Sequence, residues 1–258
     1  FLILGMLAIV VVTGTAVYKT PISLTENLVS ASTYCTTSPE NPVLVARAAY
    51  AEDLETGNML YAKNEHTQLP LASIAKVMTV AVALEILPKD RLIRIPKEAL
   101  TPEGDGGLFQ DELWRPLPLA DITLNASVND GAHALALAAA EEKKETLEDF
   151  IARMNAKAFD VGMARTFFLS DTGLDVSSTT AGAYGSAEDI AILLSYVQKT
   201  DPRILERSAK HNLTYTSESA IVHNVTNTSG ALDVLKNITA SKTGFTDLAG
   251  GNIAVVFE

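Results

Sequence analysis

A serine and a lysine at the start of an apolar segment are the first residues whose types and spacing suggest catalysis. Ser73 precedes Lys76 by three residues, so on a helix the two side chains share one face. We expect a helix over residues 73–87 with Ser73 as its cap, where unpaired N–H groups and the helix dipole favour developing negative charge. A lysine whose pKa is lowered by burial or by a nearby cation can take the serine proton. Alone, the pair is more typical of a capped helix with a surface lysine.

Two later motifs add polar groups of the kind that such a serine needs. Ser127 and Asn129 precede an alanine-rich segment, so both side chains are expected at a helix start, facing a cleft. Lys242 and Thr243 are expected to end a strand, and Gly244 lets a substrate backbone approach closely. Lys242 is also a candidate for the cation that lowers the pKa of Lys76. Three such motifs in order favour a nucleophilic site over three unrelated helix and strand ends.

The elements that must position these motifs predict an α+β fold. Strand-like segments occur at both ends of the folded region and helical periodicity lies between them. We expect the terminal strands to share one antiparallel sheet that the helices cover. Further helices are predicted over residues 117–126, 130–143, 146–161 and 187–199, and hairpins pair 43–54 with 59–62, 211–216 with 219–223, and 237–242 with 251–257.

The N-terminal part of the chain predicts a different organisation. Residues 1–18 carry no charge and are interpreted as a membrane anchor or a signal segment. Residues 19–42 are rich in Thr, Ser, Pro and Asn and are expected to be a linker. Residues 43–258 then form the catalytic domain, exported from the cytoplasm under either interpretation. Because the chain stops within a strand-like run, the domain is expected to be incomplete at its C-terminus.

Composition excludes several classes of function. Apolar residues make up 47% of the chain and charged residues 20%, as expected for a folded protein. The net charge of −11 and the lack of a basic cluster argue against nucleic acid as a partner. A single cysteine, Cys35, excludes an internal disulfide. Because no histidines form a tight metal-ligand pair, no metal site is predicted, and structural or surface roles are expected for these four: His66, His133, His211 and His223.

Longer stretches around the motifs resemble the low-molecular-weight penicillin-binding proteins, the D-alanyl-D-alanine carboxypeptidases. The similar segments are residues 70–79, 127–132, 154–163, 172–175 and 242–252. The resemblance covers about residues 43–258. It implies the serine β-lactamase-like transpeptidase fold and a serine peptidase that removes D-alanine from peptidoglycan stem peptides ending in D-Ala-D-Ala. β-Lactam antibiotics would be covalent inhibitors, and no cofactor is implied.

The resemblance also implies roles for the motif residues. Ser73 would be the acylated nucleophile and Lys76 its general base. Ser127 would relay a proton toward the leaving group, and Asn129 would position the base and the substrate backbone. The substrate-binding strand would contribute Lys242 and Thr243, which hold the terminal carboxylate, with Gly244 beside them and the N–H of Phe245, which joins that of Ser73 in the oxyanion hole.

Two departures and two alternatives accompany this interpretation. Ala75 stands where the family more often has Thr, and Asp171 stands where Pro is common. A β-lactamase of the same fold is one alternative, but no glutamate between residues 129 and 242 has Asn four residues later, as class A enzymes have. A catalytically idle cell-wall-binding protein is the other, and the intact motifs argue against it.

Overall fold

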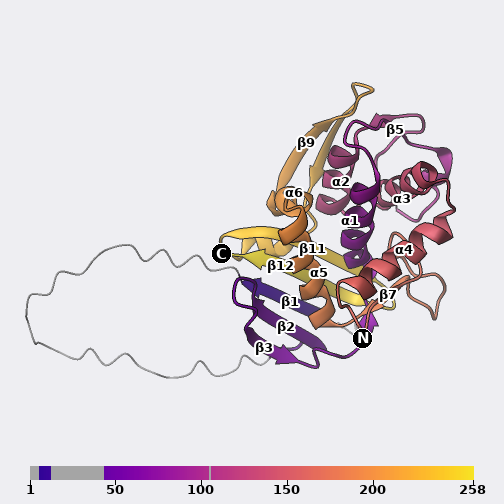
Figure 1. Ribbon diagram of the computed structural model, residues 1–258. Coiled ribbons are helices and arrows are strands. Elements are labelled where there is room, and N and C mark those ends of the chain that lie inside the picture. Colours follow the sequence, from indigo (N-terminus) through magenta and orange to yellow (C-terminus); the bar gives the residue numbers. More distant parts are fainter. Residues whose placement is uncertain (1–5, 13–43, 105) are drawn as a thin grey trace, which may run out of the picture.

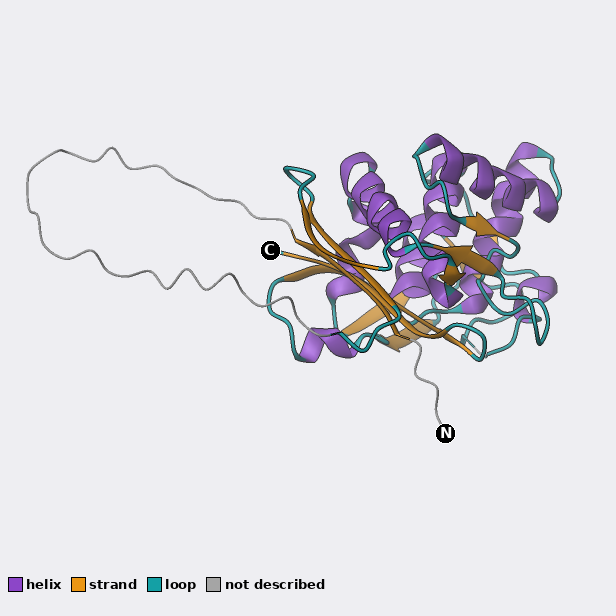
Figure 2. Ribbon diagram, turned by 90° about the horizontal axis from the view of Figure 1, so that it is seen from below, coloured by secondary structure: helices purple, strands orange, loops and turns teal. Residues whose placement is uncertain are grey.

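The computed structural model describes residues 6–12, 44–104 and 106–258 (Figure 1). Its main sheet has five strands in the order β11-β12-β1-β2-β3, and most helices gather on one side of it (Figure 2). The strands of this sheet are β1 Met6–Val12, β2 Ala48–Asp53, β3 Met59–Lys63, β11 Ile238–Thr246 and β12 Gly250–Phe257. The pairs β2–β3 and β11–β12 are antiparallel, as the sequence predicts.

A helical cluster packs beside the sheet and is built around one central helix. The helices are α1 Lys76–Ile86, α2 Pro116–Asn125, α3 Asn129–Lys143, α4 Leu147–Asp160, α5 Ala187–Thr200 and α6 Arg203–Glu206. Residues 76–83 of α1 are all buried, and α1 packs against α2, α3, α4 and α5. A helix that is apolar all round is suited to this central place. The helix that begins with Lys76 is therefore the axis of the core.

Shorter elements connect the cluster with the sheet. The 3₁₀ turns are η1 Ala72–Ala75, η2 Lys97–Leu100, η3 Arg207–Ala209 and η4 Gly230–Asp233. The minor strands are β4 Leu69–Pro70, β5 Ile93–Arg94, β6 Leu113–Trp114, β7 Phe167–Phe168, β8 Ala183–Gly185, β9 Asn212–Thr216 and β10 Val222–Thr226. The turn η1 packs on β11 and β12, so the residues just before α1 lie against the sheet. The five predicted helices and three predicted hairpins are all present, with ends shifted by a few residues.

The placement of β1 differs from the sequence prediction. We expected residues 1–18 to leave the domain as an anchor or signal segment, whereas Met6–Val12 forms a strand between β12 and β2, parallel to both. The sheet is therefore mixed and not purely antiparallel. Periodicity alone does not separate a short apolar strand in the middle of a sheet from other apolar segments. The predicted linker over residues 19–42, like residues 1–5 and 13–18, lies outside the described residues.

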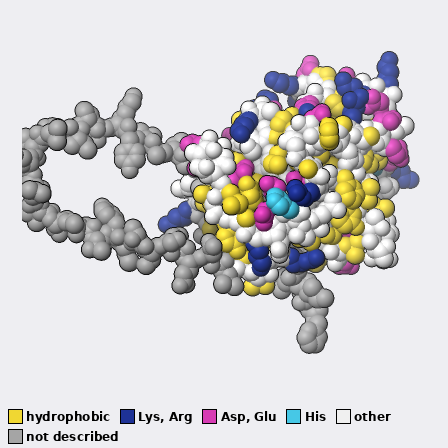
Figure 3. Space-filling model, turned by 60° about the horizontal axis from the view of Figure 1, so that its bottom comes forward, with side chains coloured by type: hydrophobic (Ala, Val, Ile, Leu, Met, Phe, Trp, Pro, Cys, Tyr) yellow, Lys and Arg dark blue, Asp and Glu magenta, His cyan; other side chains and the backbone are white. Residues whose placement is uncertain are grey.

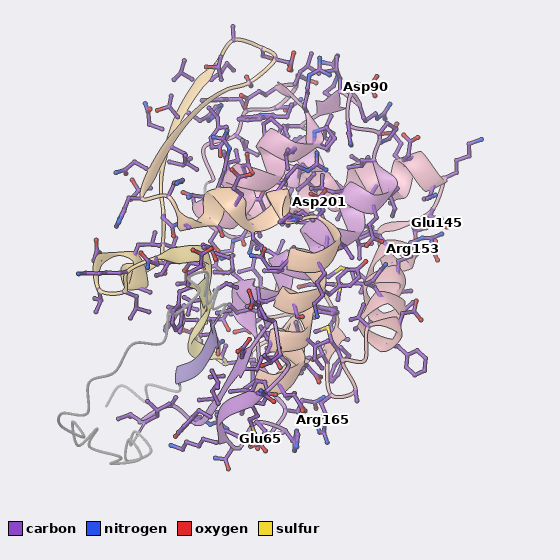
Figure 4. The ribbon with its side chains drawn as sticks, turned by 60° about the vertical axis from the view of Figure 1, so that its left-hand side comes forward. Glu65, Asp90, Glu145, Arg153, Arg165 and Asp201 are labelled. Atoms are coloured by element: carbon purple, nitrogen blue, oxygen red, sulfur yellow. The ribbon has the colours of Figure 1, made fainter. Side chains whose placement is uncertain are left out.

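The surface carries charges of both signs. Figure 3 shows acidic and basic side chains dispersed among apolar ones on one face. The start of α4 is an example: Thr146 and Asp149 form a capping box, and Arg153 pairs with Glu145 through two nitrogens (Figure 4). In the part of the chain that the structure describes, no helix is both long and apolar enough to cross a bilayer.

Candidate active site

The nucleophile candidate lies in the turn that leads into α1. Ser73 is the second residue of η1, and Lys76 is the first residue of α1. The Lys76 Nζ lies 2.8 Å from the Ser73 Oγ. Ser73 was expected as a helix cap, but neither η1 nor α1 has a side-chain capping bond at its start. The serine hydroxyl instead contacts the lysine, an arrangement that suits proton transfer between the two.

Lys76 is fully buried, which determines its proton affinity. Its Nζ also donates to the backbone oxygen of Thr172 at 2.7 Å. Burial lowers the pKa of Lys76 to about 7, although the negative charge of Asp171 acts in the opposite direction. A substantial neutral fraction therefore exists near pH 7, and a neutral amine 2.8 Å from a hydroxyl is competent as a general base.

The second and third motifs meet in a matching lysine–serine contact. Lys242 Nζ lies 2.8 Å from Ser127 Oγ and donates to the backbone oxygen of Thr243 at 2.6 Å. Burial and then the charge of Lys76 lower the pKa of Lys242 well below its ordinary value. We expected Lys242 to lower the pKa of Lys76, but burial lowers it and Lys242 is not among the causes of the shift.

Ser127 and Asn129 hold unusual positions at the start of α3. Ser127 has φ of +60°, a conformation uncommon for residues other than glycine and frequent at functional sites. Asn129 Nδ2 donates to the backbone oxygen of Glu103 at 2.6 Å, while its buried Oδ1 has no partner among the described atoms. A buried acceptor without a partner is unfavourable, which makes this oxygen a candidate for a substrate N–H group.

Strand β11 brings its polar residues against the nucleophile turn. The Lys-Thr-Gly motif was expected at the end of a strand, but β11 continues to Thr246 because its ladder with β12 extends that far. A Cβ on Gly244 would lie 2.9 Å from both the backbone N of Ser73 and the backbone oxygen of Leu71. Only glycine permits this approach, which places the strand carrying Lys242, Thr243 and Phe245 beside Ser73.

A cleft of about 570 Å³ opens next to these residues. Its lining includes Asn129 from α3 and the exposed ring of Phe245 from β11. The lining also contains three acidic residues: Glu103, Asp175 and Asp247. The contacts above and this cleft join the eight predicted site residues into one region: Ser73, Lys76, Ser127, Asn129, Lys242, Thr243, Gly244 and Phe245.

Sequence reasoning missed one buried pair. His133 Nδ1 lies 2.6 Å from Asp171 Oδ2, and both side chains are almost fully enclosed. His133 was expected to be structural, and Asp171 was noted only as a departure from the resembling family. The one available signal was the position of His133, one helical turn after Asn129.

Comparison with known proteins identifies the family. The profile described as D-alanyl-D-alanine carboxypeptidase, Peptidase_S11, matches residues 35–256. A D-alanyl-D-alanine endopeptidase of Escherichia coli (strain K12) is 30% identical over 228 residues, which are 85% of this chain and 69% of that protein. The D-alanyl-D-alanine carboxypeptidase DacF of Bacillus subtilis (strain 168) is 32% identical over 161 residues, 60% of this chain. The chain spans only 39% of the length of DacF.

Solved structures agree on the fold. Penicillin-Binding Protein D2 from Listeria monocytogenes, in its ampicillin-bound form, is 29% identical with a TM-score of 0.65, covering 82% of this chain and 83% of that one. A D-alanyl-D-alanine carboxypeptidase from Mycobacterium tuberculosis H37Rv is 22% identical with a TM-score of 0.73, covering 84% and 79%. The predicted α+β fold of the penicillin-binding type is confirmed. The chain belongs to the S11 peptidase family of D-alanyl-D-alanine carboxypeptidases.

Proposed function

We propose that this chain is a serine peptidase that cleaves the terminal D-alanyl-D-alanine bond of peptidoglycan stem peptides through an acyl-enzyme on Ser73. The observation that carries the proposal is the 2.8 Å contact between Ser73 Oγ and the buried amine of Lys76, whose pKa is about 7. An idle binding protein would have no use for a buried lysine held on a serine hydroxyl.

In the acylation step, Ser73 Oγ attacks the carbonyl carbon of the penultimate D-alanine while Lys76 Nζ takes the hydroxyl proton. The backbone N–H groups of Ser73 and Phe245 would stabilise the negative charge on the carbonyl oxygen. Collapse of the tetrahedral intermediate breaks the peptide bond, and the leaving nitrogen gains a proton through Ser127. D-alanine departs, and water then hydrolyses the ester on Ser73.

The lysine on β11 fits a substrate with a free carboxylate. A carboxylate near Lys242 and Thr243 would favour the charged form of Lys242, which burial otherwise disfavours. Binding of the correct substrate would therefore bring its own counter-charge into the site. A substrate that ends at this position, as D-Ala-D-Ala does, supplies that carboxylate.

An endopeptidase is the second candidate function. The Escherichia coli relative that covers 85% of this chain is a D-alanyl-D-alanine endopeptidase. Carboxypeptidase and endopeptidase reactions share the acyl-enzyme and differ in the amine that leaves. A free pentapeptide and a cross-linked dimer, offered in parallel, distinguish the two activities.

The substrate class implies a location on the outer side of the cytoplasmic membrane, because peptidoglycan is assembled there. A membrane attachment through residues 1–18 remains a prediction. In the structure, residues 6–12 belong to the sheet, so attachment and strand β1 are mutually exclusive for these seven residues.

The proposal is tested with a fluorescent penicillin and a D-Ala-D-Ala peptide. We expect a covalent adduct on Ser73 in wild-type protein that lasts for minutes or longer, together with release of D-alanine from the peptide. Ser73→Ala should abolish the adduct while the protein stays folded. Labelling of a folded Ser73→Ala variant would refute the assignment, and fast multiple-turnover hydrolysis of penicillin without D-alanine release would identify a β-lactamase.

A further inference from the structure

A buried histidine–aspartate pair lies directly behind the proposed general base. His133 comes from α3, and Asp171 from the loop between β7 and β8. Their side chains are 11% and 6% exposed, and the Nδ1–Oδ2 distance is 2.6 Å. A buried pair of ionisable groups is expensive to desolvate, which makes a role beyond packing worth testing.

The backbone of the Asp171 segment is attached to α1 at two consecutive residues. Thr79 Oγ1 donates to the backbone oxygen of Asp171 at 2.6 Å, and Lys76 Nζ donates to that of Thr172 at 2.7 Å. The oxygen that orients the Lys76 amine therefore belongs to the residue next to Asp171. Any displacement of Asp171 moves that acceptor.

The other partner is attached to the second motif. His133 follows Asn129 by four residues on α3, so the two side chains lie one turn apart on the same face. The contact between His133 and Asp171 thus joins the helix that carries Asn129 to the loop that holds Lys76.

Asp171 is the member of the pair whose charge acts on Lys76. The charge of Asp171 raises the pKa of Lys76 against the larger effect of burial. Burial lowers the pKa of His133, but the hydrogen bond and charge of Asp171, with smaller contributions from Glu98 and Asp130, raise it overall. The contact with Asp171 therefore shifts His133 toward its protonated form, whose charge opposes that of Asp171. The charge of Lys76 in turn lowers the pKa of Lys242, after the larger effect of burial.

We propose that His133 and Asp171 are positioning residues that hold the Thr172 acceptor in place and set the proton affinity of Lys76 through the balance of their opposite charges. The inference rests on the proposed function, because it assumes that Lys76 is the general base. Neither residue touches the reacting atoms.

The pH profile of the acylation rate by penicillin tests the charge balance. Wild-type acylation should rise with pH through about 7, where Lys76 loses its proton. Asp171→Asn keeps an acceptor for His133 but removes the negative charge that raises the pKa of Lys76, so the acid limb should move to lower pH. The shift should be at most about one unit, because burial then favours neutral His133. His133→Gln keeps a donor for Asp171 but removes the positive charge, so the limb should move to higher pH.

Two control variants separate charge from structure. Thr79→Val removes a hydrogen bond to the same loop without changing any charge, so the rate should fall at all pH values with the limb in place. Glu112→Gln weakens a similar buried pair, in which His223 Nε2 on β10 lies 2.6 Å from Oε1 of Glu112, the residue just before β6. Among the described residues, the hydrogen-bond partners of Glu112 include no residue of the proposed site, so the acid limb of this variant should not move.

Opposite shifts in Asp171→Asn and His133→Gln support the proposal. A limb that stays at the wild-type pH in both folded variants, or moves in the same direction in both, would overturn it. If only one of the two variants folds, a shift of its acid limb in the predicted direction supports the proposal, and no shift or the opposite shift overturns it. Absence of acylation in the wild-type protein, or a wild-type profile with no acid limb near pH 7, would instead refute the proposed function.

Discussion

The two lysines of this site have buried amines, and their burial lowers the stability of the folded protein more than that of any other site residue. Lys76 and Lys242 are 0% and 1% exposed, and each amine contacts a serine hydroxyl and a backbone oxygen. A buried ammonium is poorly solvated, so both lysines have a lowered pKa. Burial of the Lys76 amine lowers the stability of the folded protein, but it also keeps the amine neutral enough to act as a base.

Because burial of the Lys76 ammonium is unfavourable, we predict that Lys76→Met stabilises the protein while abolishing acylation. Because the folded pKa of about 7 lies below the ordinary 10.5, the unfolded chain binds more protons between these values. The wild-type free energy of unfolding therefore rises with pH across this window, and the penalty is complete below pH 7. The penalty is on the order of several kcal/mol and outweighs two lost hydrogen bonds of about 1 kcal/mol each.

Thermal unfolding at two pH values measures this effect. Lys76→Met should unfold roughly 5 °C or more above wild type at pH 6, and the gain should shrink at pH 9. Ser73→Ala, which removes the hydroxyl and leaves the lysine, serves as the matched control and should show no such pH-dependent gain. An equal gain at both pH values would mean that protonation of Lys76 carries no penalty.

The residues of the site were predictable to different degrees. Ser73 and Lys76 are adjacent on one turn, so their spacing alone predicts their contact. The contact between Lys242 and Ser127 joins residues 115 apart, and that between His133 and Asp171 joins residues 38 apart. No local period encodes such pairs. The first depends on how β11 packs against the start of α3, and the second on how the loop between β7 and β8 packs against α3.

At the scale of elements, the turn η1 is held between strand β11 and the loop that follows β7. A Cβ on Gly173, whose φ is +77°, would lie 2.1 Å from the backbone oxygen of Ala72. On β11, Gly244 also approaches the turn closely, since its Cβ would lie 2.9 Å from the backbone N of Ser73. Ala72 itself has φ of +48°, an uncommon conformation for alanine. Backbone packing on both sides thus fixes the nucleophile turn, so no large neighbouring side chains are needed to hold Ser73 in place.

Gly244→Ala should separate β11 from the nucleophile turn. The added methyl would lie 2.9 Å from two backbone atoms that have little freedom to move. We expect acylation to fall by 100-fold or more, as a displacement of about 1 Å in a reacting group can cause. Stopped-flow measurement with a fluorescent penicillin determines the rate.

The matched control lies on the neighbouring strand. Gly251 on β12 pairs with Phe245, and a Cβ there would meet nothing within 4 Å. Gly251→Ala should therefore retain a near wild-type acylation rate. Equal rates in the two variants would show that the close approach of β11 to Ser73 is not needed for catalysis.

The elements themselves were largely predictable, and their ends were not. The capping box at Thr146 marks the start of α4 within one residue of the prediction. Strand β11 runs four residues beyond its predicted end because hydrogen bonds to β12 continue to Thr246. The sequence near Gly244 resembles a turn, but pairing between strands decides where a strand ends.

At the scale of the whole molecule, the sheet depends on a strand from the N-terminal segment. Strand β1 pairs with β12 over seven residues and with β2 over six. It thereby joins the C-terminal hairpin that carries Lys242 to the hairpin formed by β2 and β3 (Figure 1). The sequence did not predict this, because the apolar residues of the segment suit a membrane as well as the middle of a sheet.

A proline in β1 distinguishes the two roles of that segment. Ile9 lies at the centre of β1, opposite Ala254 on one side and Tyr50 on the other. Proline removes a ladder hydrogen bond and is poorly tolerated within a central strand. Ile9→Pro should therefore lower the thermal unfolding midpoint of the chain by several degrees and weaken acylation through loss of order in β12. Ile9→Val retains the N–H donor and a β-branched side chain, so it should unfold close to wild type. If residues 1–18 lie in a membrane instead, Ile9→Pro and Ile9→Val would unfold at the same temperature, and both would remain with the membrane fraction.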